Sequence, residues 1–411
     1  MYLPFFVMLL TVSMLAQSET SDEALRQQAD LLAHRYIITD GHVDLPYRLR
    51  VKNFRLSKEF IGIPVETSEG DFDYVRAKKG GLDAPFMSIY IPSEYQETGG
   101  AKELADSLID MVNGIITAHP DKFAAGLTPD QVEKNFKAGK ISLPMGMENA
   151  APFLKLSDVA YYQKRGIRYA TLTHGKDNQI CDSSYDNTRT WNGLSPYGRE
   201  VVLEMNRRGI MVDISHVSDA AFYQTIGIVK APVIASHSSC RKFTPGFQRN
   251  MDDFMIQALG RNGGVILINF GSDFLDGQVT KNRDELRDKL RLMLEEKGLK
   301  DSDEAAKPYI DAFKSLYEKP LFADVELVVD HIDHVVKLAG VDHVGFGSDF
   351  DGVGDSLPTG LKDVAAYPNL IFELLKRGYS EEDIEKICYK NLFRVWREVD
   401  RVAADMQKTG K

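Results

Sequence analysis

Short apolar runs alternate with longer amphipathic segments along most of the chain. Eight of the apolar runs have the length and composition of buried strands: residues 37–38, 87–91, 141–147, 169–172, 210–214, 232–235, 265–269 and 344–347. The segments between them show helical periodicity, most clearly in residues 101–117, 161–165, 198–208, 219–225 and 251–261. This alternation of strands and helices predicts a parallel sheet in an α/β fold.

The number of strands decides which parallel sheet is expected. Eight strand–helix units can close into a (β/α)₈ TIM barrel, although an open doubly wound sheet fits the same count. Residues 274–321 interrupt the alternation with two charged helical segments, 284–297 and 303–317. We therefore expect a barrel with a helical insertion between strands seven and eight.

The N-terminal residues have a different pattern. Residues 3–16 form an apolar run that has the length of a signal-peptide core and is too short for a transmembrane helix. Small residues follow at Ala16 and Ser18, although no basic residue comes before the run. We expect residues 1–18 to be a cleaved signal peptide and residues 19–411 to be a single exported domain, periplasmic or extracellular, without a membrane span. An uncleaved hydrophobic anchor is the alternative.

Composition narrows the class of protein. Of 411 residues, 43% are hydrophobic and 27% are charged, which is typical of a globular chain with a sizeable core. The 60 acidic residues outnumber the 50 Lys and Arg residues, and the resulting net charge of −10 disfavours a nucleic-acid partner. The three cysteines, Cys181, Cys240 and Cys388, have no CxxC spacing, so they predict no cysteine zinc site and at most one disulfide.

Polar side chains stand where several predicted strands end. In a barrel, the loops at the carboxyl ends of the strands carry the chemistry. The first strand ends in Asp-Gly-His42-Val-Asp44, and residues two apart on a strand face the same side, so His42 and Asp44 can ligate one metal ion. The third strand ends at Glu148 and the eighth at Asp349. These positions add two carboxylates to the same rim.

Histidines end the next three strands in succession. His174, His216 and His237 follow strands four, five and six. The chain has only nine histidines, and four of them, counting His42, stand at strand ends. Any one of them could be a packed histidine, but their convergence with carboxylates favours a metal site.

These motifs, taken together, resemble the membrane (renal) dipeptidase family of zinc peptidases. The similarity runs in order from about residue 36 to residue 399. It rests on His42-Val-Asp44, Glu148, Thr173-His174, Gly193-Leu-Ser-Pro, Asp213-Ile-Ser-His216, Ser236-His237, Arg249-Asn250 and Gly345-Phe-Gly-Ser-Asp349. The resemblance implies a (β/α)₈ barrel with two Zn²⁺ ions per chain.

The family pattern implies a role for each matching residue. His42 and Asp44 would hold one ion, His216 and His237 the other, and Glu148 would bridge both; His174, Arg249 and Asp349 would contact substrate. Two ions sharing a carboxylate and a hydroxide would supply the nucleophile and polarise the scissile carbonyl. Asp349 would carry the proton, His174 would stabilise the oxyanion, and the planar fork of Arg249 would bind a free α-carboxylate.

The expected function is therefore that of a metallodipeptidase. It would hydrolyse small dipeptides, with the family's tolerance for a D-residue at the carboxyl side, either alone or as a homodimer. Hydrolysis of an N-acyl amino acid on the same two ions is the alternative, and a catalytically silent surface binding protein is disfavoured because every expected ligand is present.

The chain departs from mammalian members of the family at three points. Phe274 stands where they carry a tyrosine, so carboxylate binding would rest more on Arg249. The cysteine close behind the strand-four histidine is absent. The C-terminal residues 401–411 are polar and charged, unlike a GPI signal.

Overall fold

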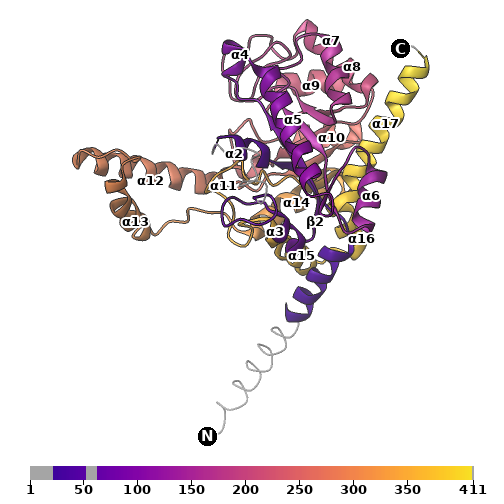
Figure 1. Cartoon of the computed structure of the whole chain (residues 1–411). Coiled ribbons are helices and arrows are strands. Elements are labelled where there is room, and N and C mark those ends of the chain that lie inside the picture. Colours follow the sequence, from indigo (N-terminus) through magenta and orange to yellow (C-terminus); the bar gives the residue numbers. More distant parts are fainter. Residues whose placement is uncertain (1–21, 52–62, 410–411) are drawn as a thin grey trace.

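An eight-stranded parallel sheet forms the centre of the molecule, with helices around it (Figure 1). The computed structural model describes residues 22–51 and 63–409. The eight strands of the central sheet, in spatial order, are β1 (Ile38–Val43), β2 (Leu82–Tyr90), β5 (Met145–Glu148), β6 (Ile167–Thr171), β7 (Met211–Asp213), β8 (Ile234–Ser238), β9 (Val265–Ile268) and β10 (Val344–Phe346). A parallel bridge between Val43 and Phe350 brings the ends of β1 and β10 together. The predicted (β/α)₈ barrel is confirmed.

Helices surround the barrel. Residues 22–35 are helical, and the further helices are α2 (Leu45–Val51), α3 (Tyr74–Gly80), α4 (Tyr95–Thr98), α5 (Ala101–Ala118), α6 (Pro129–Lys137), α7 (Leu156–Lys164), α8 (Pro196–Arg208), α9 (Asp219–Ile228), α10 (Asp253–Asn262), α11 (Ser272–Leu275), α12 (Gly277–Glu296), α13 (Lys307–Ser315), α14 (Val325–Ala339), α15 (Tyr367–Lys376), α16 (Glu381–Glu385) and α17 (Asn391–Thr409). Local sequence sets several starts: Ser195 caps α8 by accepting the Gly198 amide, and Pro196 occupies the first turn. None of the helices in the described ranges is long and apolar enough to cross a membrane.

The predicted third strand, residues 141–147, is wrong in extent. The chain forms two strands there, β4 (Ile141–Leu143) and β5, which are separated by Pro144. β4 pairs with β3 (Phe123–Ala125) in a small separate sheet, and only β5 enters the barrel. A proline has no amide hydrogen to donate to a sheet, so it ends one run of pairing and allows the next to begin elsewhere.

Large side chains fill the barrel and fix its shape. Gly146 of β5 leaves room for the ring of Tyr169, whose atoms would lie 1.9–2.3 Å from a Cβ at that position. Phe86 packs against Tyr169 and against Trp396 of α17, with ring centroids 5.4 and 5.3 Å apart. These four residues come from β5, β6, β2 and α17, so contacts between four different elements hold this part of the core together.

The insertion lies where the sequence predicted it, between β9 and β10, the seventh and eighth barrel strands. Helices α12 and α13 form an arm that extends away from the barrel (Figure 1). At its base, Arg283 forms an ion pair with Asp273 at 3.4 Å and donates a hydrogen bond to the Leu321 carbonyl at 3.1 Å. The three cysteines are buried and free, so the one disulfide that the sequence allowed does not form. The expected signal peptide, residues 1–18, lies outside the described residues.

Candidate metal centre

Five predicted ligands meet at the carboxyl end of the barrel. His42 is in β1, Glu148 ends β5 and His237 is in β8, while Asp44 and His216 follow β1 and β7. Each of these residues is at most 6% exposed. Burying so many ionisable side chains together is costly unless they are paired or bind a cation.

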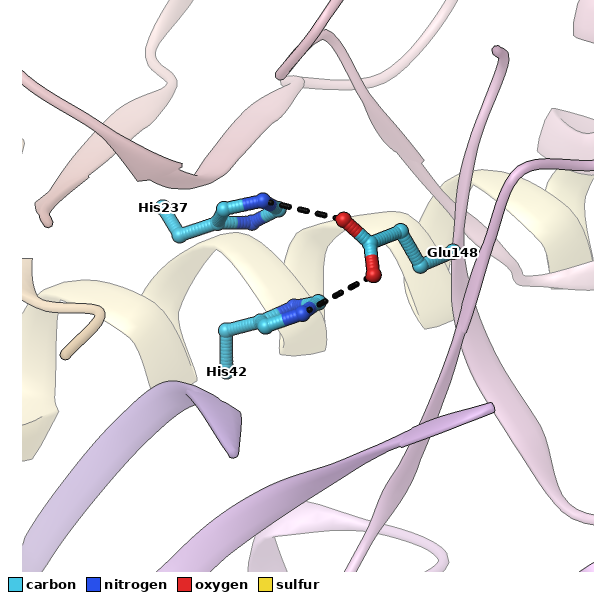
Figure 2. A group of neighbouring side chains, drawn as sticks. All are labelled: His42, Glu148 and His237. Atoms are coloured by element: carbon cyan, nitrogen blue, oxygen red, sulfur yellow. Dashed lines mark ion pairs between the residues drawn. The ribbon is translucent and has the colours of Figure 1, made fainter. Parts of the chain in front are cut away.

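Glu148 is at the middle of this group. Its Oε2 lies 3.3 Å from His42 Nε2, and its Oε1 lies 3.2 Å from His237 Nε2 and 3.1 Å from His216 Nε2. Figure 2 shows the two carboxylate oxygens turned toward different histidines. One oxygen therefore faces the side of the group that contains His42 and Asp44, and the other faces the side that contains His216 and His237.

On the second side of the group, the side that contains His216 and His237, the two histidines approach each other closely. His216 Nε2 and His237 Nε2 are 2.9 Å apart, and both are near the same carboxylate oxygen. Burial lowers the pKa of each imidazole well below its ordinary value, so both rings are neutral near pH 7. Neutral imidazole is the form that ligates a metal, and converging lone pairs of this kind are stabilised by a cation between them.

The side that contains His42 and Asp44, the first side, carries more negative charge than the other. His42 Nε2 lies 3.5 Å from Asp44 Oδ2. Burial lowers the pKa of His42, but Tyr169 and Glu148 outweigh burial and raise the pKa well above its ordinary value. Burial also raises the pKa of Glu148, but His42 and the other histidines outweigh it and hold that pKa well below its usual range. The carboxylates therefore favour a positive charge at this position.

The donor set fits a divalent metal. Among the described residues, His42 Nε2 and Asp44 Oδ1 are buried without a hydrogen-bond partner. Three overlapping groups have ligand atoms close enough to hold an ion: His42, Glu148 and His237; Glu148, His174 and His216; and His42, Asp44 and Asp349. Imidazole and carboxylate ligands of this kind suit zinc. These groups place His237 with His42 and Glu148, and the His237 ring also stacks on His42 with centroids 3.8 Å apart. The geometry therefore leaves open which of the two ions His237 would hold.

Asp349 lies beside the first side, just after β10. Its backbone is in the left-handed region with φ of 63°, and its Oδ2 accepts a hydrogen bond from Asn269 Nδ2 at 2.8 Å. Burial raises the pKa of Asp349 to about 7; His42 opposes this shift, and Asp44 adds to it. A carboxyl group whose pKa is near neutrality can both accept and donate a proton at working pH.

A cavity of about 560 Å³ opens directly onto these residues. Asp44, Glu148, His174, His216 and Asp349 are part of its lining. The His174 side chain is 23% exposed, and its Nε2 lies 3.6 Å from Glu148 Oε1. The cavity is therefore large enough for a small molecule to reach the proposed ligands, with His174 at the boundary between them.

Arg249 lies behind the cavity and is only 3% exposed. It donates hydrogen bonds of 2.6 Å to Ser238 Oγ and to the His237 carbonyl. Its guanidinium carbon is 5.3 Å from the centroid of the Phe274 ring, and Phe274 does line the cavity. The structure thus brings Arg249 to the group of predicted residues, but its side chain is anchored on the strand that carries His237.

Two tyrosines at the cavity, Tyr90 and Tyr47, are absent from the sequence-based prediction. Tyr90 ends β2, lines the cavity and packs edge-on against His174 with centroids 4.7 Å apart. Tyr47 packs on Tyr90 in turn, with centroids 4.8 Å apart. Tyr90 lies inside the predicted strand 87–91, whereas β2 ends at Tyr90 and pairs it with Glu148, so no strand-end signal in the sequence marked this residue.

Fold and site together define a class of protein. A (β/α)₈ barrel whose carboxyl-end rim gathers imidazoles and carboxylates beneath a cavity is the arrangement of a metal-dependent hydrolase. The family model for membrane dipeptidase (Peptidase family M19) matches residues 26–410. The chain belongs to this family, and it is a metallodipeptidase.

Relatives and solved structures agree with this assignment. The chain is 33% identical over 377 residues to the dipeptidase TcpJ of Claviceps purpurea (strain 20.1), covering 90% of this chain and 78% of that protein. It is 31% identical over 412 residues to the dipeptidase AtaJ of Aspergillus terreus (strain NIH 2624 / FGSC A1156), covering 93% and 89%. The probable dipeptidase PvdM from Pseudomonas aeruginosa has a similar structure, with 26% identity, a TM-score of 0.76, and coverage of 93% of this chain and 100% of that chain.

A further neighbour shares the fold. The metallo peptidase from Rhodobacter sphaeroides, liganded with a phosphinate mimic of the dipeptide L-Ala-D-Ala, has a TM-score of 0.72 at 23% identity. The match covers 89% of this chain and 99% of that chain.

Proposed function

We propose that this metallodipeptidase uses two Zn²⁺ ions to hydrolyse the single peptide bond of small dipeptides. One ion would be held by His42 and Asp44, the other by His216 and His237, and both by Glu148. The observation that carries the proposal is the position of Glu148, whose two oxygens face the two sides of the group at 3.1–3.3 Å from histidine Nε2 atoms. When bound, the ions would activate water and polarise the scissile carbonyl.

The residues at the cavity would handle the proton and the charge. Asp349 would accept the proton released by the attacking water and return it to the leaving amine, which its pKa of about 7 favours. His174 stands beside Glu148 at the cavity wall and would stabilise the developing oxyanion.

Arg249 would select substrates of dipeptide length by binding the free carboxylate of the substrate. Arg249 retains donors beyond the two that it uses on Ser238 and His237, and a guanidinium can bind a carboxylate with two parallel hydrogen bonds. Phe274 has no hydroxyl group, so Arg249 would supply this contact. A tripeptide would place its carboxylate elsewhere and would be a poor substrate.

We infer that a D-residue at the carboxyl side is tolerated; the Rhodobacter sphaeroides neighbour is liganded with a mimic of a dipeptide that ends in D-Ala. We also infer that the chain is exported, on the strength of the apolar run at residues 3–16.

A substrate panel on zinc-loaded protein tests the function. We expect L,L and L,D dipeptides to be hydrolysed, and a tripeptide, an N-acyl amino acid and a C-terminally amidated dipeptide to be turned over poorly. Removing the negative charge of the carboxylate should lower kcat/KM by roughly 10- to 150-fold, because charge-assisted hydrogen bonds contribute about 1.5–3 kcal/mol. Preferred hydrolysis of the N-acyl amino acid would replace the dipeptide assignment.

The variant Arg249→Met isolates the role of Arg249. It should hydrolyse the free and the amidated dipeptide with similar kcat/KM, while Arg249→Lys should keep part of the preference for the free acid. The ratio of the two substrates is the readout, because it does not depend on the fraction of protein that holds metal. A ratio unchanged from wild type in Arg249→Met would assign the carboxylate to another residue.

A further inference from the structure

Two histidines of the centre are held from behind by hydroxyl groups. We propose that Tyr169 and the pair Asp213–Ser236 are positioning residues, each of which fixes the tautomer and orientation of one histidine and thereby supports one of the two ions. The inference rests on the proposed function for the presence of the ions, and it assigns a task to residues that do not touch substrate. Partners of this kind raise the basicity of a ligating imidazole and hold its ring in place.

The Tyr169 hydroxyl has only one arrangement that satisfies its neighbours. Its single proton goes to the Gly41 carbonyl at 3.0 Å, because a carbonyl can only accept. The hydroxyl oxygen lies 2.8 Å from His42 Nδ1 and must therefore accept the proton on that nitrogen. His42 Nε2, which faces Glu148, is then the nitrogen that is free to ligate a metal.

Tyr169 is itself held rigidly. The ring occupies the space over Gly146, and it packs against Phe86 with centroids 5.4 Å apart. Tyr169 is fully buried, so its hydroxyl cannot exchange its partners for water. Because packing in the barrel interior fixes the position of Tyr169, the hydrogen bond from His42 to its hydroxyl fixes the orientation of His42.

Ser236 does the same for His237 by a different route. The Ser236 hydroxyl donates its proton to Asp213 Oδ2 at 2.6 Å, because a carboxylate can only accept. Its oxygen lies 2.7 Å from His237 Nδ1 and accepts the proton on that nitrogen. His237 Nε2, which faces Glu148 Oε1, is then the nitrogen available to the metal.

Asp213 is fixed by several donors. Its Oδ1 accepts hydrogen bonds from the amides of Ser215 and Ser236 at 3.0 and 2.8 Å, and its Oδ2 also accepts the Thr171 hydroxyl. Asp213 is fully buried. A carboxylate held in this way provides a charged end to the chain Asp213–Ser236–His237, which is a carboxylate–histidine arrangement with one hydroxyl inserted.

His216, the third histidine of the centre, has no such hydrogen-bonded support. Its Nδ1 is buried and has no hydrogen-bond partner among residues 22–51 and 63–409. Its ring is flanked by His174, with centroids 4.2 Å apart, and by His237 at 4.9 Å. The side of the centre that contains His216 therefore depends on the Ser236 network alone for its second-layer support.

Two single-hydroxyl deletions test the proposal. Crystals of the zinc-loaded full chain are equilibrated in a zinc buffer at fixed free concentration, and anomalous diffraction gives the occupancy of each metal position. We expect Tyr169→Phe to lower the affinity of the position beside His42 by about 10- to 100-fold, and Ser236→Ala to do the same at the position beside His237. Each variant should leave the other position closer to wild type.

Matched controls separate positioning from packing. Tyr162→Phe removes a hydroxyl from another fully buried tyrosine, and Ser142→Ala removes one from another fully buried serine; neither residue touches the centre. Both controls should keep wild-type occupancy. If Ser236→Ala fails to fold, Tyr169→Phe decides alone. Unchanged occupancy beside His42, or equal loss at both positions in a folded variant, overturns the inference. A wild-type chain that binds no zinc would instead refute the proposed function.

Discussion

Replacing Gly352 by alanine tests how closely the two carboxylates at the centre depend on the turn after β10. Gly352 follows Asp349 in this turn, and its amide donates to the Asp349 carbonyl at 3.0 Å. A Cβ at position 352 would lie 2.2 Å from Asp349 Oδ1 and 2.2 Å from Asp44 Oδ2. Its φ lies outside the left-handed region, so the backbone itself accepts alanine without strain.

The size of the effect follows from these distances. Contacts of a Cβ below 3.0 Å are essentially never found, so each carboxylate oxygen would have to move by about 0.8 Å. A displacement of about 1 Å of a catalytic group can lower the rate about 10²-fold. We therefore expect Gly352→Ala to lower kcat for a dipeptide about 10²-fold and to weaken zinc binding beside Asp44, while the fold is retained.

Three measurements decide the outcome. Chromatography of the released amino acids gives kcat and KM, mass spectrometry gives zinc per chain, and a melting curve gives Tm. Gly175→Ala is the matched control: it follows His174 directly, but its Cβ would contact only Ser93 Oγ at 3.7 Å. We expect wild-type kcat in this control. Wild-type kcat in Gly352→Ala would show that the positions of Asp44 and Asp349 are not critical for turnover.

Further predictions concern the ligands, the proton carrier and the barrel. Glu148→Ala should remove both ions, whereas His216→Ala should mainly remove one; equal zinc content in the two variants would refute the bridging role. Asp349→Asn should keep zinc but lower kcat by roughly 10²–10⁴-fold, and an unchanged kcat would exclude Asp349 as the proton carrier. Burial raises the pKa of Asp83 to about 7, above its unfolded value of about 3.9. The stability that its protonated form supplies is therefore present below pH 4 and lost as the pH rises through 7. Asp83→Asn should raise Tm relative to wild type at pH 8 but not at pH 4, and equal differences at both pH values would contradict this assignment.

Most strand positions of the barrel were predictable because buried parallel strands are short apolar runs, although β1 and β2 extend well beyond the predicted residues 37–38 and 87–91. The prediction failed at residues 141–147, where two apolar segments adjoin and look like one. Pro144 was the available signal, since its missing amide hydrogen ends the pairing of β4 before β5 begins. The partner of β4, the three-residue strand β3, is too short to carry a recognisable period.

The candidate ligands were predictable for the same reason: polar residues that directly follow buried strands are exceptional. The supporting residues were not. Tyr169 lies within a strand and reads as a packing residue, and its contact with His42 spans 127 positions of the sequence. Ser236 was visible only as part of a motif. Their tasks depend on which side chains face each other after the barrel has closed, and no local pattern encodes this.

The closure of the barrel has a consequence for how the centre forms during folding. The bridge between Val43 and Phe350 joins the end of the first strand to the turn after the last strand, and His42 and Asp44 lie on one side of this junction while Asp349 lies on the other. These residues are about three hundred positions apart, and contacts of such long sequence separation slow folding because the entropy of closing a long loop must be lost first. The proposed ions would be held by residues on or just after β1, β5, β7 and β8, so they would bind only the folded barrel and would shift the folding equilibrium by mass action. Zinc would then stabilise the closed barrel as well as supply its chemistry.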